Sequence, residues 1–295
     1  MATTGVLGST MHHEERGADA SGIPFVFLHG NPTSSHLWRR VLPRIDGRIR
    51  VLAPDLIGMG RSGKPGGAYR FADHARYLDA WFDALGLDDA VLVGQDWGGA
   101  LALDRAARHP GRVRGVAVME TILRPMSWEE HPPASRARFE AMRTPGVGEE
   151  MVLDRNLFIE DGLGRTVSQP MSEEDRAVYA APYPTRESRR PLLQWARSMP
   201  LDGEPADVVS RVAEYAAWMG VSPQVPKLLL TFDGSPTLMV GDALTAWCRE
   251  HVSALETAYC GSAAHLCPED RPEEIAAALN AWADRHGLAD RRPAR

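Results

Sequence analysis

The chain has 295 residues, of which 44% are hydrophobic and 24% charged, and its formal net charge is −6 at pH 7. This composition is typical of a globular protein whose core is large enough to carry an inserted subdomain. No apolar run is long enough to span a membrane, and the acidic balance offers no electrostatic surface for nucleic acid, so neither partner is expected. The basic residues Arg291, Arg292 and Arg295 are interpreted as a solvated chain end.

The N-terminus and the cysteines indicate the cellular compartment. Residues 1–22 lack the basic start and the apolar core of a secretory signal. The three cysteines, Cys248, Cys260 and Cys267, are too few, and odd in number, for a disulfide framework, which favours a reducing environment. We therefore expect a cytoplasmic protein.

Short apolar runs alternate along the chain with segments of helical periodicity. This alternation is expected when helices cover both faces of a mostly parallel sheet, so the predicted fold class is α/β. Strands are predicted at residues 25–28, 51–53, 90–93, 113–119, 228–231 and 258–259, and helices at residues 71–85, 100–107 and 275–282.

The composition changes in the middle of the chain. Between about residues 123 and 203 it becomes rich in Pro, Arg and Glu, with helical segments and no run typical of a strand. This change predicts two domains: a core formed by residues 1–122 and 204–295, and an inserted helical cap formed by residues 123–203.

An aspartate directly follows one of the predicted strands, in Gly94-Gln95-Asp96-Trp97-Gly98. Glycines on both sides permit a tight strand-to-helix turn, the nucleophile elbow, which holds its central side chain exposed above the sheet. A carboxylate there suits displacement of a leaving group from saturated carbon or the opening of a strained ring, whereas a serine would attack a carbonyl. The same short motif also fits an Asp that only caps the following helix.

Two glycine-rich loops precede the elbow, each after a predicted strand and at the sheet edge where open α/β sheets bind ligands. The first is His29-Gly30-Asn31-Pro32, and the second spans residues 55–62. The second loop lacks the Lys-Ser or Lys-Thr ending of a nucleotide phosphate loop, so we interpret it as a structural turn.

Together these motifs resemble those of the haloalkane dehalogenases of the α/β-hydrolase superfamily. The resemblance extends over about residues 25–282 and rests on residues 29–35, 55–62 and 95–99, on Met119-Glu120, and on His265 followed by Glu269-Asp270. It implies an α/β-hydrolase fold that converts a small hydrophobic haloalkane into an alcohol, a halide ion and a proton through a covalent alkyl ester. No metal, nucleotide or flavin cofactor is expected, because the chemistry needs none and the His and Cys residues lack zinc-like spacing.

The joint presence of Asn31 and Trp97 makes the resemblance specific, because epoxide hydrolases share the aspartate elbow. A halide that leaves carbon in a dry cavity gathers charge that water cannot solvate, so fixed hydrogen-bond donors must replace that solvation. The indole N–H of Trp97 and the amide of Asn31 are such donors. Their backbone N–H groups are also expected to form the oxyanion hole.

The ester must be cleared by water, and this second step needs a base. His265 lies in the loop before the last predicted helix, where this superfamily carries its triad histidine. His29 is interpreted as shaping its own loop. The other histidines are interpreted as surface residues in tails, loops or helical faces: His12, His13, His36, His74, His109, His131, His251 and His286.

Two carboxylates are candidates to orient His265, since each follows a predicted strand. Glu120 follows the strand that ends at Met119, and Asp233 follows the strand at residues 228–231. Dehalogenases with an Asn before the loop proline use the earlier glutamate, so the resemblance favours Glu120, with Asp233 as the alternative.

Three other functions fit parts of the sequence. An epoxide hydrolase would use cap tyrosines such as Tyr179 and Tyr183 to protonate the opening oxygen, which leaves Asn31 and Trp97 without a task. A coelenterazine-dependent luciferase, or monooxygenase, of the sea pansy type keeps the same five site positions. A non-enzymatic ligand receptor on this fold would not need a complete set of nucleophile, base and acid.

The substrate pocket is the least determined part of the site. The apolar residues Phe139 and Phe158 in the cap and Leu238 in the core are candidates to line it, as are Leu157 and Leu163, and ordinary core packing explains each of them equally well. They favour a small hydrophobic halogenated alkane without selecting its length.

Overall fold

The computed structural model describes residues 2–290, which form one eight-stranded sheet in the order β1-β2-β4-β3-β5-β6-β7-β8. The pairs β1–β2 and β2–β4 are antiparallel, and the other neighbours run parallel. The strands are β1 Ala2–Val6, β2 Ser9–Arg16, β3 Phe25–Leu28, β4 Val51–Pro54, β5 Ala90–Asp96, β6 Val113–Thr121, β7 Lys227–Asp233 and β8 Leu255–Ser262.

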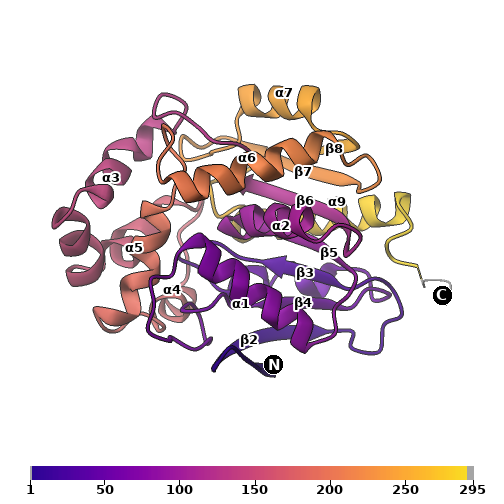
Figure 1. Cartoon of the computed structure of the whole chain (residues 1–295), viewed down its shortest axis with the longest axis horizontal. Helices are drawn as coiled ribbons and strands as arrows, with labels where there is room; N and C mark the ends of the chain where they lie inside the picture. The colour runs from indigo at the N-terminus through magenta and orange to yellow at the C-terminus, as the bar shows by residue number, and fades with distance from the viewer. Residues whose placement is uncertain (1, 291–295) are drawn as a thin grey trace.

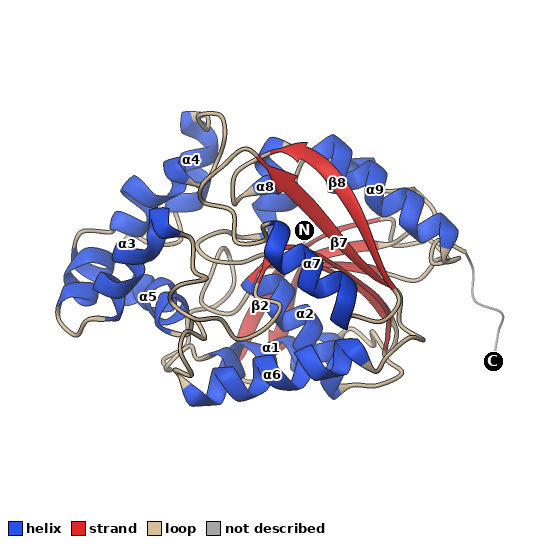
Figure 2. Cartoon of the chain, turned by 90° about the horizontal axis from the view of Figure 1, so that it is seen from above, coloured by secondary structure: helices blue, strands red, loops and turns tan. Residues whose placement is uncertain are grey.

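Helices cover both faces of this sheet, which confirms the predicted α/β class. Helices α1, α2 and α6 lie on one face, and α8 and α9 lie on the other (Figures 1 and 2). The helices of the core are α1 Phe71–Ala84, α2 Trp97–Arg108, α6 Ala206–Gly220, α7 Asp242–His251, α8 Cys267–Asp270 and α9 Pro272–Arg285, with two short 3-10 turns, η1 Ser35–Trp38 and η2 Leu42–Arg44.

The main core lies on the central strands. Every residue of β3, β4 and β5 is buried, as expected for strands covered by helices on both faces. The three cysteines are buried and unpaired. No helix of the described chain is long and apolar enough to cross a membrane.

The predicted strands and helices all form, but two strands at the N-terminus were missed. β2 carries His, Glu and Arg side chains on an antiparallel edge ribbon, and such a polar strand has no apolar run to reveal it. The prediction that His12, His13, His74 and His131 lie at the surface was wrong, because all four are buried. The first two lie on β2, and His74 lies on the buried side of α1. The three residues Arg291, Arg292 and Arg295 lie outside the described residues.

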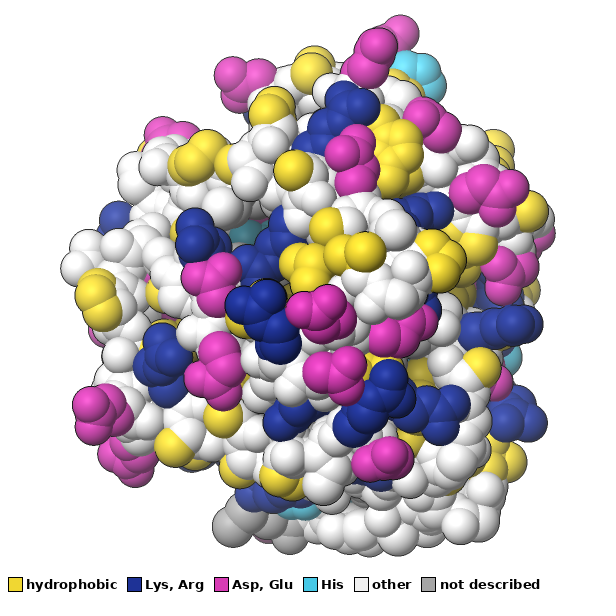
Figure 3. All heavy atoms as spheres, turned by 90° about the vertical axis from the view of Figure 1, so that its left-hand side faces the viewer, with side chains coloured by type: hydrophobic (Ala, Val, Ile, Leu, Met, Phe, Trp, Pro, Cys, Tyr) yellow, Lys and Arg dark blue, Asp and Glu magenta, His cyan; other side chains and the backbone are white. Residues whose placement is uncertain are grey.

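A helical insertion between β6 and α6 forms a separate layer beside the sheet domain, at the left of Figure 1 and facing the viewer in Figure 3. Its elements are α3 Pro133–Arg143, η3 Glu149–Asp154, η4 Phe158–Gly162, η5 Leu163–Arg165, α4 Glu173–Ala180, η6 Glu187–Arg189 and α5 Arg190–Arg197, of which η3 and η4 are π-helical. The boundaries at residues 123 and 203 remain predictions.

Candidate active site

The elbow places Asp96 at the end of β5, and α2 begins at the next residue. The backbone of Asp96 has φ 53° and ψ −128°, a region that a non-glycine residue seldom occupies. The glycines serve another purpose: a Cβ on Gly98 would lie 2.1 Å from the carbonyl oxygen of Leu28, and one on Gly94 would lie 2.5 Å from the backbone nitrogen of Gly99. The strain is therefore at Asp96 itself, and the glycines allow close backbone packing around it.

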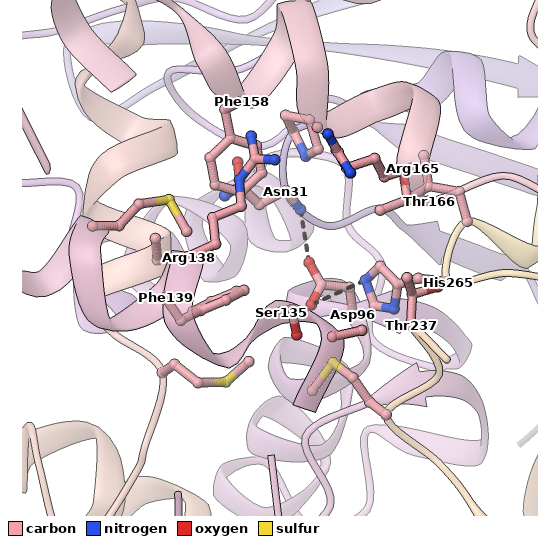
Figure 4. A pocket seen from close by; sticks show the side chains of 18 of the residues that line it. Asn31, Asp96, Ser135, Arg138, Phe139, Phe158, Arg165, Thr166, Thr237 and His265 are labelled. Carbon is pink, nitrogen blue, oxygen red and sulfur yellow. Dashed lines mark hydrogen bonds and ion pairs between the residues drawn. The ribbon is translucent and has the colours of Figure 1, made fainter. Parts of the chain in front are cut away.

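The Asp96 carboxylate is held by two backbone donors. The backbone N–H of Asn31 donates to Oδ2 over 2.9 Å, and the backbone N–H of Trp97 also hydrogen-bonds the carboxylate. Oδ1 faces Nε2 of His265 at 3.8 Å (Figure 4). Burial raises the pKa of Asp96, while His265 and the two backbone donors act in the opposite direction.

His265 faces Glu120 with its other ring nitrogen. Nδ1 lies 3.1 Å from Oε2 of Glu120, and a carboxylate can only accept, so Nδ1 carries the proton and Nε2 keeps its lone pair in the neutral ring. Glu120 is 1% exposed and also accepts from the backbone nitrogens of Met239, at 2.8 Å, and Val240, at 3.1 Å. Burial lowers the pKa of His265, but the hydrogen bond to Glu120 and the charges of Asp96 and Glu120 outweigh it and raise the pKa overall.

Asp233, the alternative acid, lies elsewhere. It ends β7 and accepts hydrogen bonds from Ser262 Oγ at 2.5 Å and from the hydroxyl of Tyr259 at 2.8 Å. These two bonds hold its pKa below the ordinary value. No hydrogen bond or ion pair within residues 2–290 connects Asp233 with His265.

Gln95 is a buried polar residue of the site that the sequence reasoning did not single out. Its amide nitrogen donates to the backbone carbonyl of His265 at 2.9 Å and lies 3.4 Å from Nε2 of the same residue. Since the carbonyl can only accept, the amide nitrogen must point toward His265. Its place at the end of a buried strand was an available signal, because a buried polar side chain needs a partner.

Asn31 and Trp97 line the same cavity as Asp96 and His265. One N–H of the Asn31 amide donates to the carbonyl oxygen of Leu192 in α5 at 3.1 Å, and the amide has a second N–H. The Trp97 ring stacks on Trp195, also of α5, with centroids 4.5 Å apart and planes at 25°. Both predicted donors are therefore held by the cap as well as by the core.

Trp195 and His74 form a support behind Trp97 that the sequence did not reveal. The two rings stack at 4.1 Å between centroids, and Trp195 is fully buried. Burial lowers the pKa of His74 to about 3, so this histidine is a neutral aromatic packing residue. Contacts of this kind depend on how the cap docks, and no local pattern predicts them.

The cavity beside Asp96 has a volume of about 140 Å³ for the centres of water-sized molecules. Phe139 and Phe158 line it, in agreement with the predicted pocket, and Figure 4 shows both among the cap residues around Asp96. The prediction for Leu238 was wrong: Thr237 and Met239 line the cavity, while the side chain between them packs against the hydrophobic core. Leu157 and Leu163 are likewise outside the lining, which includes Gly162 and Arg165 from the same segment.

The second glycine-rich loop is built around a buried carboxylate. Asp55 accepts from the backbone nitrogen of Ser35 at 2.6 Å and from that of Arg61 at 2.8 Å. These backbone donors are used within the protein, which fits the interpretation of a structural turn. Among residues 2–290, no group of three or more His, Cys, Asp or Glu side chains could hold a metal ion.

The family model of the α/β hydrolase fold matches residues 23–241, so the sheet and its aspartate elbow define an α/β hydrolase. The chain is 46% identical over 282 residues to a haloalkane dehalogenase of Mesorhizobium japonicum, covering 94% of this chain and 89% of that one. It is 43% identical to a haloalkane dehalogenase of Sphingobium indicum, covering 90% of each. The crystal structure of haloalkane dehalogenase DbeA from Bradyrhizobium elkani matches it with a TM-score of 0.92 at 44% identity, covering 98% of this chain and 99% of that one.

The chain belongs to the haloalkane dehalogenase family. It is thus an enzyme of hydrolytic dehalogenation, as the sequence motifs predicted, and the epoxide hydrolase and luciferase alternatives are not favoured.

Proposed function

We propose that this enzyme cleaves small hydrophobic haloalkanes by a displacement in which Asp96 is the nucleophile. The observation that carries the proposal is the asymmetry of the Asp96 carboxylate. Oδ2 accepts from the backbone N–H of Asn31, and Oδ1, on the side of His265, remains to attack the halogenated carbon. Attack forms a carbon–oxygen bond, breaks the carbon–halogen bond and leaves an alkyl ester on Asp96.

The departing halide is held, in this proposal, by Nε1 of Trp97 and Nδ2 of Asn31. Both side chains line the cavity, and each is oriented by α5 of the cap, through the Trp195 stack and the Leu192 carbonyl. Donors fixed in advance stabilise charge that develops in the transition state at little reorganisation cost.

The ester is then hydrolysed by water that His265 activates. Its Nε2 lies on the Asp96 side of the ring, and Glu120 both fixes the Nδ1–H tautomer and stabilises the imidazolium that forms. Water adds to Cγ of Asp96, and negative charge gathers on Oδ2, which already accepts from the backbone N–H of Asn31. The alcohol leaves with the former Oδ1, and one water oxygen remains in the carboxylate.

Gln95 is a positioning residue in this scheme. Its amide donates to the His265 backbone carbonyl and lies beside the ring, so it helps to hold His265 in place next to Asp96.

The two cap tyrosines support dehalogenation over epoxide opening. The hydroxyl of Tyr179 donates to Glu269 at 2.5 Å, and that of Tyr183 lies 3.4 Å from the carbonyl oxygen of Pro32. Neither tyrosine lines the described cavity, so neither is arranged to protonate an epoxide oxygen beside Asp96.

The test is to trap the ester. In His265→Phe, the first step should proceed and the second should stop, so incubation with 1,2-dibromoethane should add one alkyl group to the peptide that contains Asp96, measured by mass spectrometry. His251→Phe, at an exposed position, is the matched control and should turn over without an adduct. An unmodified Asp96 in the His265 variant would refute the mechanism.

The proposal also includes the domain boundaries and the cellular location. Residues 123–203 are the cap domain, an assignment supported by the helical elements from α3 to α5. The cytoplasmic location is supported by the three unpaired thiols.

A further inference from the structure

Two arginines line the catalytic cavity on its cap side. Arg138 belongs to α3 and Arg165 to η5, and both border the cavity that contains Asp96 and His265. Figure 4 shows the two side chains across the cavity from Asp96. A cavity for plain haloalkanes has no evident use for guanidinium groups, since apolar chains offer them no acceptor.

The arginines share a single acid. Arg138 Nη1 lies 2.8 Å from Oδ2 of Asp161, and Arg165 Nη2 lies 3.0 Å from Oδ1 of the same carboxylate. The hydrogen bond from Arg165 and that from Arg138 hold the pKa of Asp161 below its ordinary value. Among the described lining residues, the one acidic side chain is Asp96 itself. The two guanidinium groups and Asp161 together therefore carry one excess positive charge.

Arg138 is the better ordered of the two cations. Its side chain is 23% exposed, whereas that of Arg165 is 68% exposed. Nη2 of Arg138 also donates to the backbone carbonyl of Leu157 at 2.5 Å, which fixes the guanidinium against the cavity wall. A guanidinium has five N–H donors, so these two bonds leave donors for an anion.

The rest of the cavity lining is largely apolar. Phe139, Phe158, Met142 and Met199 are among the cap residues that line it. The arrangement has an anionic nucleophile at one end, an apolar middle and a cationic group at the other end. A substrate that matches it carries a halogenated carbon, a methylene chain and a terminal anion.

We propose that the enzyme accepts ω-halogenated carboxylates as substrates, with the halogenated carbon at Asp96 and the carboxylate bound by Arg138 with help from Arg165. This inference rests on the proposed function for the role of Asp96. The reaction is balanced as in the haloalkane case: the ω-halocarboxylate and water give the ω-hydroxycarboxylate, a halide ion and a proton. The carboxylate completes the pairing of two guanidinium groups with two anions.

Two physical properties follow from this arrangement. The rate should depend on chain length, because a short substrate cannot reach Arg138 while its carbon contacts Asp96. The preference for the acid should weaken as ionic strength rises, since the guanidinium groups are partly exposed and salt screens exposed charges. Sodium sulfate is the suitable salt, because chloride would compete at the proposed halide site.

The experiment compares kcat/KM for ω-bromocarboxylates, from 6-bromohexanoate to 10-bromodecanoate, with kcat/KM for their methyl esters. At the best chain length, Arg138→Gln should lower the acid-to-ester ratio by about tenfold, the range of a lost charge-assisted hydrogen bond. Asp161→Asn should raise the ratio several-fold, because it frees both guanidinium groups from their shared partner. Arg155→Gln, an exposed cap arginine outside the cavity, should leave the ratio unchanged.

The outcomes distinguish failure of carboxylate recognition from failure of the proposed dehalogenase function. Halide release from the esters without release from any of the acids would overturn carboxylate recognition and leave the dehalogenase mechanism intact. An acid-to-ester ratio that neither Arg138→Gln nor Asp161→Asn changes would also overturn it. Failure to release halide from the esters as well would refute the proposed function.

Discussion

The two sides of the catalytic cavity are built on different principles. On the core side, Asp96, Glu120 and His265 stand at the ends of strands or in a loop beside them, and each makes hydrogen bonds or close charge contacts with groups of the same domain. On the cap side, Phe139 and Phe158 offer apolar surface, and the arginines share a partner near solvent. The comparison separates a buried, hydrogen-bonded group of polar side chains on the core side from a more apolar and more exposed wall on the cap side.

Two residues of the core side have strained backbones. Asp96, the last residue of β5, has φ 53°, and Glu120, within β6, has φ 45°. Such conformations persist where the surroundings over-determine them, and Thr121 contributes by donating from Oγ1 to the carbonyl of Asp96 at 2.6 Å. The core side therefore holds its side chains in fixed directions. The cap reaches it at Trp97 and Asn31, through α5.

The largest expected effect concerns the acid of the core side. Glu120→Gln should lower kcat for 1-bromobutane by about 10²–10⁴, because the amide no longer stabilises the imidazolium and disturbs the ring tautomer. The measurement is steady-state halide release. Asp233→Asn is the matched control and should change kcat less than twofold, since its partners are Tyr259 and Ser262. If Asp233→Asn were inactive and Glu120→Gln active, Asp233 and not Glu120 would be the catalytic acid. The reaction centre would then include the end of β7.

A smaller effect is expected where the cap supports the core. Trp195→Leu should weaken product inhibition by bromide about three- to tenfold, because an aromatic stack is worth roughly 0.5–1.5 kcal/mol and Trp97 would lose its partner. Trp195→Phe should retain part of the effect.

Trp38→Phe is the control for loss of a buried tryptophan in the core, where Trp38 packs on Phe27. It should lower the melting temperature without changing bromide inhibition. Equal effects of both tryptophans on bromide would mean that the cap contributes only stability.

The smallest effect is a displacement of the pH dependence. His265 acts as a base only when its ring is neutral. The pKa of His265 lies above the ordinary value of 6.5. On acidification the ring is therefore protonated, and the active form lost, at a higher pH than in a free histidine. Ester formation removes the charge of Asp96, which is one of the causes of that elevation. We expect Asp96→Asn, a neutral stand-in for the ester, to lower the pKa of His265, measured by NMR titration.

Asp233→Asn serves again as the control, and in it the His265 titration should stay where it is in the wild-type protein. A rise, or no change, in the Asp96 variant would show that the two groups are not electrostatically coupled. The reaction centre would then be less tightly paired than the contacts indicate.

The predictability of each part depended on how local its signal is. The buried strands β3, β5 and β6 are apolar runs and were predicted, whereas β2, next to the edge strand β1, was missed because it carries polar residues. Asp96 is marked by its flanking glycines, but its strained φ is a property of the folded turn. Leu238 was assigned to the pocket by its apolarity, and the fold directs its neighbours Thr237 and Met239 there instead.

Contacts between distant segments could not be predicted in the same way. Trp195 is one of eight tryptophans, and nothing in its surroundings indicates that it stacks on Trp97 and His74. Arg138 and Arg165 are ordinary members of an arginine-rich segment until the cap folds over the sheet. Arg165 pairs with Asp161 four residues earlier, whereas Arg138 reaches the same carboxylate only because α3 lies beside η4.

The sequence by itself determined the class of reaction. A carboxylate at an elbow, a pair of donors in Asn31 and Trp97, and a histidine before the last helix are local features that resemble one family, and relatives of that family match the chain. Only the tertiary structure decided that His265 faces Glu120 rather than Asp233, and that two arginines border the cavity. The reason is physical: residue types and turns are encoded locally, whereas distances and charge balance in a cavity arise from packing of segments far apart in the chain.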